Sequence, residues 1–175
     1  MDARNFNLRE YHMRPQYPLP DEYLIELGRL VALSSQLEQQ INTWIGKLAG
    51  FDGLTDPTPF IIVNHSSTPQ KIDMMCALCE ERLADYPHLI KYKDIIGEVK
   101  SAIALRNKFV HSLIDFDKDK GCCVLMTASA RGKIKVMTED VRIGDIYSAS
   151  KSVHKAMVSL ARLVLNKEYE VPDLF

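Results

Sequence analysis

Arg106, Asn107 and His111 have the types and the spacing that phosphate chemistry needs. They lie near the end of a segment whose apolar residues recur at helical spacing. Asn107 and His111 are four residues apart, so they stack on one side of that helix, while Arg106 lies on the other side of the apolar line through Val110 and Ile114. A histidine can transfer a proton near neutral pH, and a guanidinium can stabilise charge that develops on a phosphate.

The same side chains also fit an ordinary structural role. An arginine at the solvent edge of a helix, and a histidine near its C-terminus, are both favourable without any chemistry. A second Arg-to-His spacing of this kind occurs at Arg82 and His88, but Pro87 places those two residues on either side of a helix end. Because a lone buried charge is costly, an arginine beside a core face needs a partner or a polar cleft.

Residues 106–111 resemble the R-x4-6-H signature of the HEPN superfamily, including the polar residue that often follows the arginine. HEPN domains are small helical bundles with this motif on a late helix, and the resemblance extends over about residues 21–167. It implies metal-independent cleavage of RNA by a homodimer, with no cofactor. It also implies a toxin or effector of a prokaryotic toxin–antitoxin or phage-defence system, with an antitoxin protein as a partner.

The resemblance implies a catalytic role for each of the three residues. His111 transfers the proton of the attacking 2′-hydroxyl or of the leaving 5′-oxygen, Arg106 binds the phosphate, and Asn107 orients the imidazole or a phosphate oxygen. Internal attack leaves a 2′,3′-cyclic phosphate. Because many HEPN proteins are not catalytic, the alternative function is a dimeric HEPN-like bundle that binds protein or RNA.

Further residues are candidates for supporting roles around this motif. Glu38 flanks the apolar seam of the first predicted helix, so it is one candidate partner for Arg106; the symmetry mate of the Arg106 helix is the other. Basic residues near the motif and on a predicted hairpin are candidate RNA contacts: Lys108, Arg131 and Lys133. For the hairpin residues, a solvated face is the favoured interpretation.

The cysteines favour structural roles. Cys76 and Cys79 lie within a predicted helix, whereas Cys122 and Cys123 are neighbours in a predicted strand and point to opposite faces. Neither arrangement suits zinc, so we predict buried thiols and no metal site. His65 lies in a polar stretch that is typical of a loop.

The composition describes an ordinary folded domain. The chain has 175 residues, 46% of them hydrophobic, and its 22 basic and 23 acidic residues give a net charge of -1. This balance excludes a chain-wide basic field for nucleic acid. We expect no membrane helix and no signal peptide, because no apolar run is long enough, and the cysteine pattern does not suggest a secreted protein. The expected location is the cytoplasm.

Apolar spacing and turn residues define the expected elements. Closely spaced prolines predict an extended N-terminal arm over residues 1–20, and residues 21–170 form one predicted HEPN-like helical domain. Residues 60–63 are predicted to be a short buried piece, either a helical turn or a strand. The remaining predictions are helices over 21–49, 68–83, 88–114 and 143–167, a charged loop over 115–121, strands over 122–127 and 133–137, and a tail over 170–175.

These elements predict a mainly α fold: an antiparallel four-helix bundle of HEPN type with a β-hairpin, about residues 122–137, inserted before the last helix. Short strands suggest that the hairpin is dispensable for the bundle. The 88–114 helix carries apolar residues and the polar trio on neighbouring faces, which one core does not readily accommodate. We therefore predict a homodimer whose shared cleft holds the polar residues.

Overall fold

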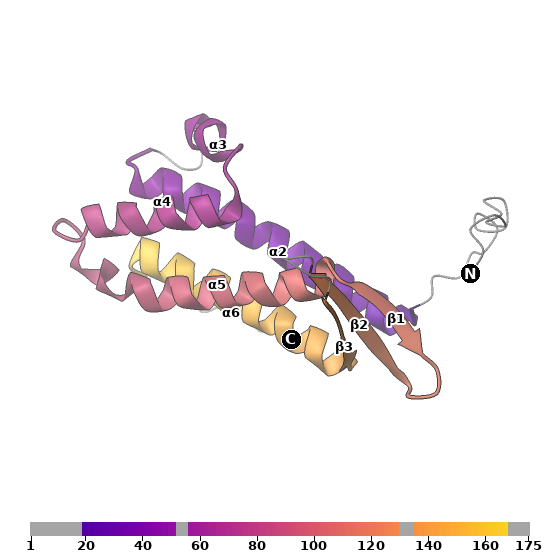
Figure 1. The fold of residues 1–175 in the computed structure, drawn as a ribbon. Coiled ribbons are helices and arrows are strands. Elements are labelled where there is room, and N and C mark those ends of the chain that lie inside the picture. Colours follow the sequence, from indigo (N-terminus) through magenta and orange to yellow (C-terminus); the bar gives the residue numbers. More distant parts are fainter. Residues whose placement is uncertain (1–18, 52–55, 130–134, 168–175) are drawn as a thin grey trace.

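A computed structural model describes residues 19–51, 56–129 and 135–167. Within these residues the fold is mainly helical, and a small three-stranded sheet packs at one end of the long helices (Figure 1). Most of the predicted N-terminal arm, the predicted C-terminal tail and the turn at Arg131 and Gly132 lie outside the described residues.

Helix α2 (Asp21–Leu48) confirms the first predicted helix. Leu30, Leu37 and Ile41 of its predicted apolar stripe are buried, and they face the other long helices. The helix ends where predicted, because Gly50 has φ of 93°, which a residue with a side chain adopts only with strain.

Helix α3 (Thr58–Val63) settles the open assignment of residues 60–63 as helical. The expectation that the whole piece is buried is wrong, since Val63 is 1% exposed but Ile61 is 70% exposed. A helix of six residues turns one face to α2 and leaves the other in solvent. The approach is close at Gly46, where an added Cβ would lie 2.5 Å from Pro59.

Helix α4 (Thr68–Glu81) begins at the predicted cap. The backbone N–H of Ser67 donates to Oε1 of Gln70 at 2.8 Å, which is half of a capping box. The helix ends two residues before the predicted end at residue 83. Its buried face carries Ile72, Met75 and Cys79.

Helix α5 (Tyr92–Val110) is shorter at both ends than the helix predicted over 88–114. Residues Pro87–Lys91 form the 3₁₀ helix η2. At the other end, Ile114 belongs to strand β1 (Leu113–Asp117), so this strand also replaces part of the predicted charged loop. Ile114 follows Val110 by one helical turn, but it also alternates with Phe116 at the two-residue period of a strand, and the strand pairing prevails.

The predicted hairpin is a three-stranded antiparallel sheet in the order β1-β2-β3. Strand β2 (Cys122–Ser129) pairs with β1 and with β3 (Lys135–Val141), so that Leu125 lies opposite Ile114 and Glu139. Leu125 is 2% exposed and belongs to the same hydrophobic core as the helices, as does Val141. This packing argues against the expectation that the region is dispensable, which stays a prediction.

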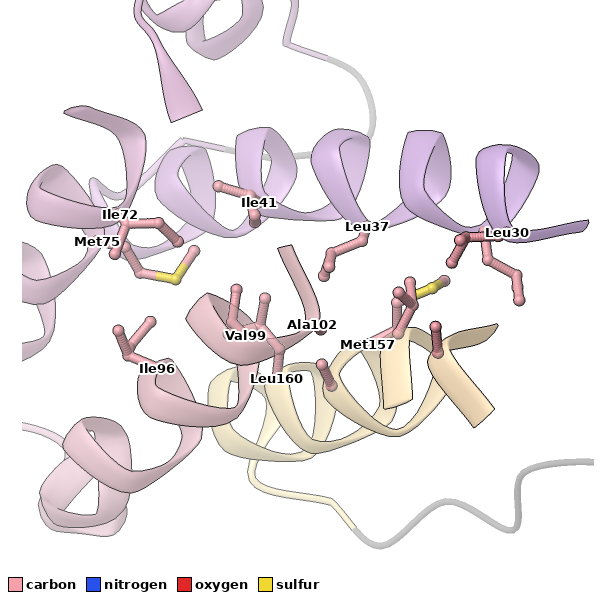
Figure 2. Close-up of a cluster of buried hydrophobic side chains, with 14 of the residues drawn as sticks. Leu30, Leu37, Ile41, Ile72, Met75, Ile96, Val99, Ala102, Met157 and Leu160 are labelled. Atoms are coloured by element: carbon pink, nitrogen blue, oxygen red, sulfur yellow. The ribbon is translucent and has the colours of Figure 1, made fainter. Parts of the chain in front are cut away.

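Helix α6 (Ile143–Leu165) confirms the last predicted helix. It packs against α2 and α5, and its buried face contributes Met157 and Leu160 to the core (Figure 2). Val99 and Ala102 of α5 meet these side chains in the same cluster. One chain thus buries the central apolar positions of α5, which removes the reason from which the homodimer is predicted; the dimer stays a prediction.

Truncating the core of the sheet tests whether the sheet supports the helical core. Replacing Leu125 by alanine should lower the free energy of unfolding by about 2–5 kcal/mol, because it leaves a cavity where sheet and helices meet. Denaturant titration measures this change. The matched control Met126→Ala, on the same strand but 40% exposed, should cost less than about 1 kcal/mol. Equal small effects would show that the sheet is peripheral.

Candidate functional site

The last turn of α5 brings the three predicted catalytic residues together. Arg106 and Asn107 are on the helix, and His111 is its C-cap residue, with φ of -106° and ψ of 4°. The backbone N–H of His111 donates to the carbonyl of Asn107 at 3.1 Å, which holds the cap onto the helix. The local sequence therefore positions all three side chains within about one and a half helical turns.

Arg106 is the centre of this group. Its Nη1 donates to Oδ1 of Asn107 at 3.0 Å and lies 2.8 Å from Nε2 of His111. Because arginine has no acceptor, Nε2 must accept this hydrogen bond, and a neutral ring then carries its proton on Nδ1. The Nε of Arg106 is buried and has no hydrogen-bond partner among the described residues.

A pocket of about 610 Å³ lies between the start of α4 and the second half of α5. The α5 wall is formed by the three residues above together with Lys100 and Ile103. The α4 wall contains Ser67, Thr68, Pro69, Ile72 and Asp73. Pockets that bind small molecules have volumes of this order.

The α4 wall gives the pocket features that the sequence analysis did not identify. The start of a helix presents backbone N–H groups and the positive end of the helix dipole, which favour an anion. The sequence does show the cap at Ser67 and the proline that follows Thr68. It does not show that this helix start lies beside Arg106, because only the packing of α4 against α5 places it there.

Two other predicted site residues, Glu38 and Lys108, are not among the residues that line the pocket. Glu38 is half-buried on α2, and among the described residues it has no hydrogen bond or salt bridge to Arg106. Lys108 donates to Glu139 at 2.8 Å and so links α5 to β3. The two predicted RNA contacts on the hairpin, Arg131 and Lys133, lie outside the described residues.

The second Arg-to-His spacing has a structural environment. Nε of Arg82 donates to the carbonyl of Leu48 at 3.1 Å, which ties the end of α4 to the end of α2. The ring of His88 contacts the ring of Tyr86, with centroids 6.0 Å apart. Arg82 and His88 therefore satisfy different neighbours, which makes this pair a useful control for the Arg106 pair.

The cysteines are free thiols, and Cys79, Cys122 and Cys123 are buried as predicted, while Cys76 is half-buried. Burial raises the pKa values of Cys79 and Cys123 to about 11, which makes both weak nucleophiles. Within the described part of the chain, no three His, Cys, Asp or Glu side chains are grouped as a metal site would need. His65 lies in a turn, as predicted.

Comparison with protein-family models, curated proteins and solved structures finds no match to this chain. No helix in the described ranges has the length and apolar character needed to cross a membrane.

The contact between Arg106 and His111 predicts the tautomer of the histidine. When the ring is neutral, its proton should lie on Nδ1, because Nε2 accepts from the guanidinium. Long-range ¹H–¹⁵N correlation spectra of the histidine ring distinguish the two tautomers. In Arg106→Met this preference should be lost, while the spectrum of His88 stays unchanged. A proton on Nε2 in the wild-type protein would contradict the contact.

Proposed function

We propose that the protein is a metal-independent endoribonuclease of HEPN type that acts in the cytoplasm. The observation that carries this proposal is the contact of 2.8 Å between Arg106 and His111 inside a pocket large enough for a nucleotide. Helices α2, α4, α5 and α6 correspond in this proposal to an antiparallel four-helix bundle of that type. A proton acceptor and a fixed cation at one phosphate are the groups that internal cleavage of RNA needs.

In the proposed reaction, Nε2 of His111 accepts the proton of the 2′-hydroxyl. The bond from the 2′-oxygen to phosphorus then forms while the bond from phosphorus to the 5′-oxygen breaks. The leaving 5′-oxygen takes the proton back from the imidazolium, and the other product ends in a 2′,3′-cyclic phosphate. Arg106 binds the phosphate oxygens and stabilises the charge that they gain in the transition state.

The free protein holds the base and the cation against each other. Arg106 occupies the lone pair of His111 that the reaction needs. A phosphate carries full charge and accepts more strongly from a guanidinium than a neutral imidazole does. Binding of the substrate phosphate therefore draws Arg106 away and frees Nε2. Asn107 accepts from the same Nη1 and limits how far the guanidinium moves.

The proposal includes the biological context that the resemblance implies. A ribonuclease of this type acts as a toxin or effector in a toxin–antitoxin or phage-defence system, with an antitoxin protein as its partner. The proposed homodimer would bring a second copy of Arg106 and His111 into one cleft.

Purified protein should cleave single-stranded RNA in the presence of EDTA and leave DNA of the same sequence intact. His111→Ala should lower the cleavage rate by about 10²–10⁴-fold, because it removes the proton acceptor. Gel assays give the rate, and mass spectrometry should find 2′,3′-cyclic phosphate ends.

The matched control is His88→Ala, which changes the histidine of the second Arg-to-His spacing and should keep wild-type activity. Sensitivity to EDTA, 3′-hydroxyl products or full activity of His111→Ala would overturn the proposed mechanism. Those results would favour the alternative function, a non-catalytic bundle that binds protein or RNA.

Arg106→Lys separates the role of charge from that of geometry. Lysine keeps the positive charge but loses the planar fork that can hold Asn107 and a phosphate at once. The cleavage rate should fall by at least about 10²-fold. Arg82→Lys, the matched change at the second spacing, should cleave at the wild-type rate. Equal activity of both variants would show that only the charge at position 106 matters.

A further inference from the structure

Asp73 of α4 and Lys100 of α5 lie on opposite walls of the pocket, and Lys100 is the lining residue of α5 that is farthest from His111 along the chain. Helices α4 and α5 run in opposite directions, and Tyr92 at the start of α5 donates a hydrogen bond to Glu80 near the end of α4. On α4, Asp73 lies about two helical turns before Glu80, and on α5, Lys100 lies about two helical turns after Tyr92. Equal rise along both helices places the two side chains at the same level.

The environment of Cys76, one turn after Asp73, supports this placement. Burial raises the pKa of the Cys76 thiol, while Lys100 lowers the pKa and Asp73 raises it. Both charges therefore lie close to one half-buried atom. Neither Asp73 nor Lys100 has a hydrogen bond or salt bridge to another residue in the described ranges, so both are available to a ligand.

The space between these charges and the phosphate-binding residues is apolar. Ile72 of α4, which is 2% exposed, and the half-buried Ile103 of α5 line it. Asn107 lies two helical turns after Lys100 on the same side of α5, which corresponds to about 10 Å along the helix axis. This is about the reach of one nucleotide from its phosphate to the far edge of its base.

We propose that this pocket binds the guanine base of the nucleotide next to the scissile phosphate, with Asp73 and Lys100 contacting its Watson–Crick edge. The inference rests on the proposed function, because it names the nucleotide that the same site selects. The base would lie against Ile72 and Ile103 while its phosphate contacts Arg106.

Guanine is the base whose edge matches an ammonium beside a carboxylate. Its N1–H and its 2-amino group are adjacent donors, which one carboxylate accepts together, and its O6 accepts from a lysine. Cytosine and adenine each offer the carboxylate one amino group, and uracil offers it one N–H.

The first experiment uses the wild-type protein and short RNA oligonucleotides that carry one guanosine in a tract of uridine. Cleavage should occur next to the guanosine, and replacing it by adenosine should lower the rate by roughly 10–100-fold. Inosine lacks only the 2-amino group, so it should give an intermediate rate. Equal rates for guanosine, inosine and adenosine would overturn the inference even if His111→Ala shows that cleavage itself is genuine.

Variants then assign the discrimination to residues. Asp73→Asn and Lys100→Met should each reduce the ratio of the guanosine rate to the adenosine rate by about tenfold. Asp94→Asn and Lys91→Met, which change the same residue types near the start of α5, should leave that ratio unchanged. If the ratio survives in both pocket variants, other residues recognise the base and the assignment is wrong.

A binding measurement separates this inference from the proposed function. Calorimetry with guanosine 3′-monophosphate and adenosine 3′-monophosphate does not require catalysis. A preference of roughly tenfold or more for the guanosine compound, lost in Asp73→Asn, would support base recognition even if no RNA is cleaved. Equal affinities for the two compounds, or no binding of either, would overturn it.

Discussion

A guanidinium cannot lie unpaired at the edge of an apolar helix face, and the structure meets this constraint locally at Arg106. Asn107 and His111 both contact its Nη1. The second contact depends on the end of α5 at Val110, since His111 then leaves helical geometry as the C-cap residue. A helix that continued to Ile114 would keep His111 on the helical path and would change its position relative to Arg106.

The end of α5 is in turn fixed by the sheet. Strand β1 begins at Leu113, two residues after His111, and pairs with β2 over its whole length. The core positions of the sheet, Leu125 and Val141, pack into the cluster that contains the helices, and Lys108 ties α5 to β3. The sequence suggests that the sheet is peripheral. In the structure, the sheet fixes β1, and β1 ends α5 next to the candidate site.

Short-range geometry explains which parts of this site could be predicted. Helical spacing predicted that Asn107 and His111 lie on one side of a helix that also carries Arg106, but it did not predict their contacts with Arg106. Periodicity defined α2 and α6 nearly to the residue. Glu38 was predicted as a partner because a buried guanidinium needs one, and Glu38 flanks the apolar seam of another helix. The α4 wall of the pocket could not be predicted from the sequence, because only the packing of α4 against α5 creates it. The end of α5 was missed because Ile114 fits both the helical and the strand period.

The overall charge of the chain limits how such a site could bind RNA. A net charge of -1 provides no long-range attraction to a polyanion, so binding must depend on a few short contacts. Arg106 and the start of α4 would neutralise only one or two phosphates. Affinity that rests on so few phosphates is weak and varies little with salt. Under the proposed function, such a protein gains more from contacts to a base, and the pocket offers apolar and charged side chains besides Arg106, Asn107 and His111.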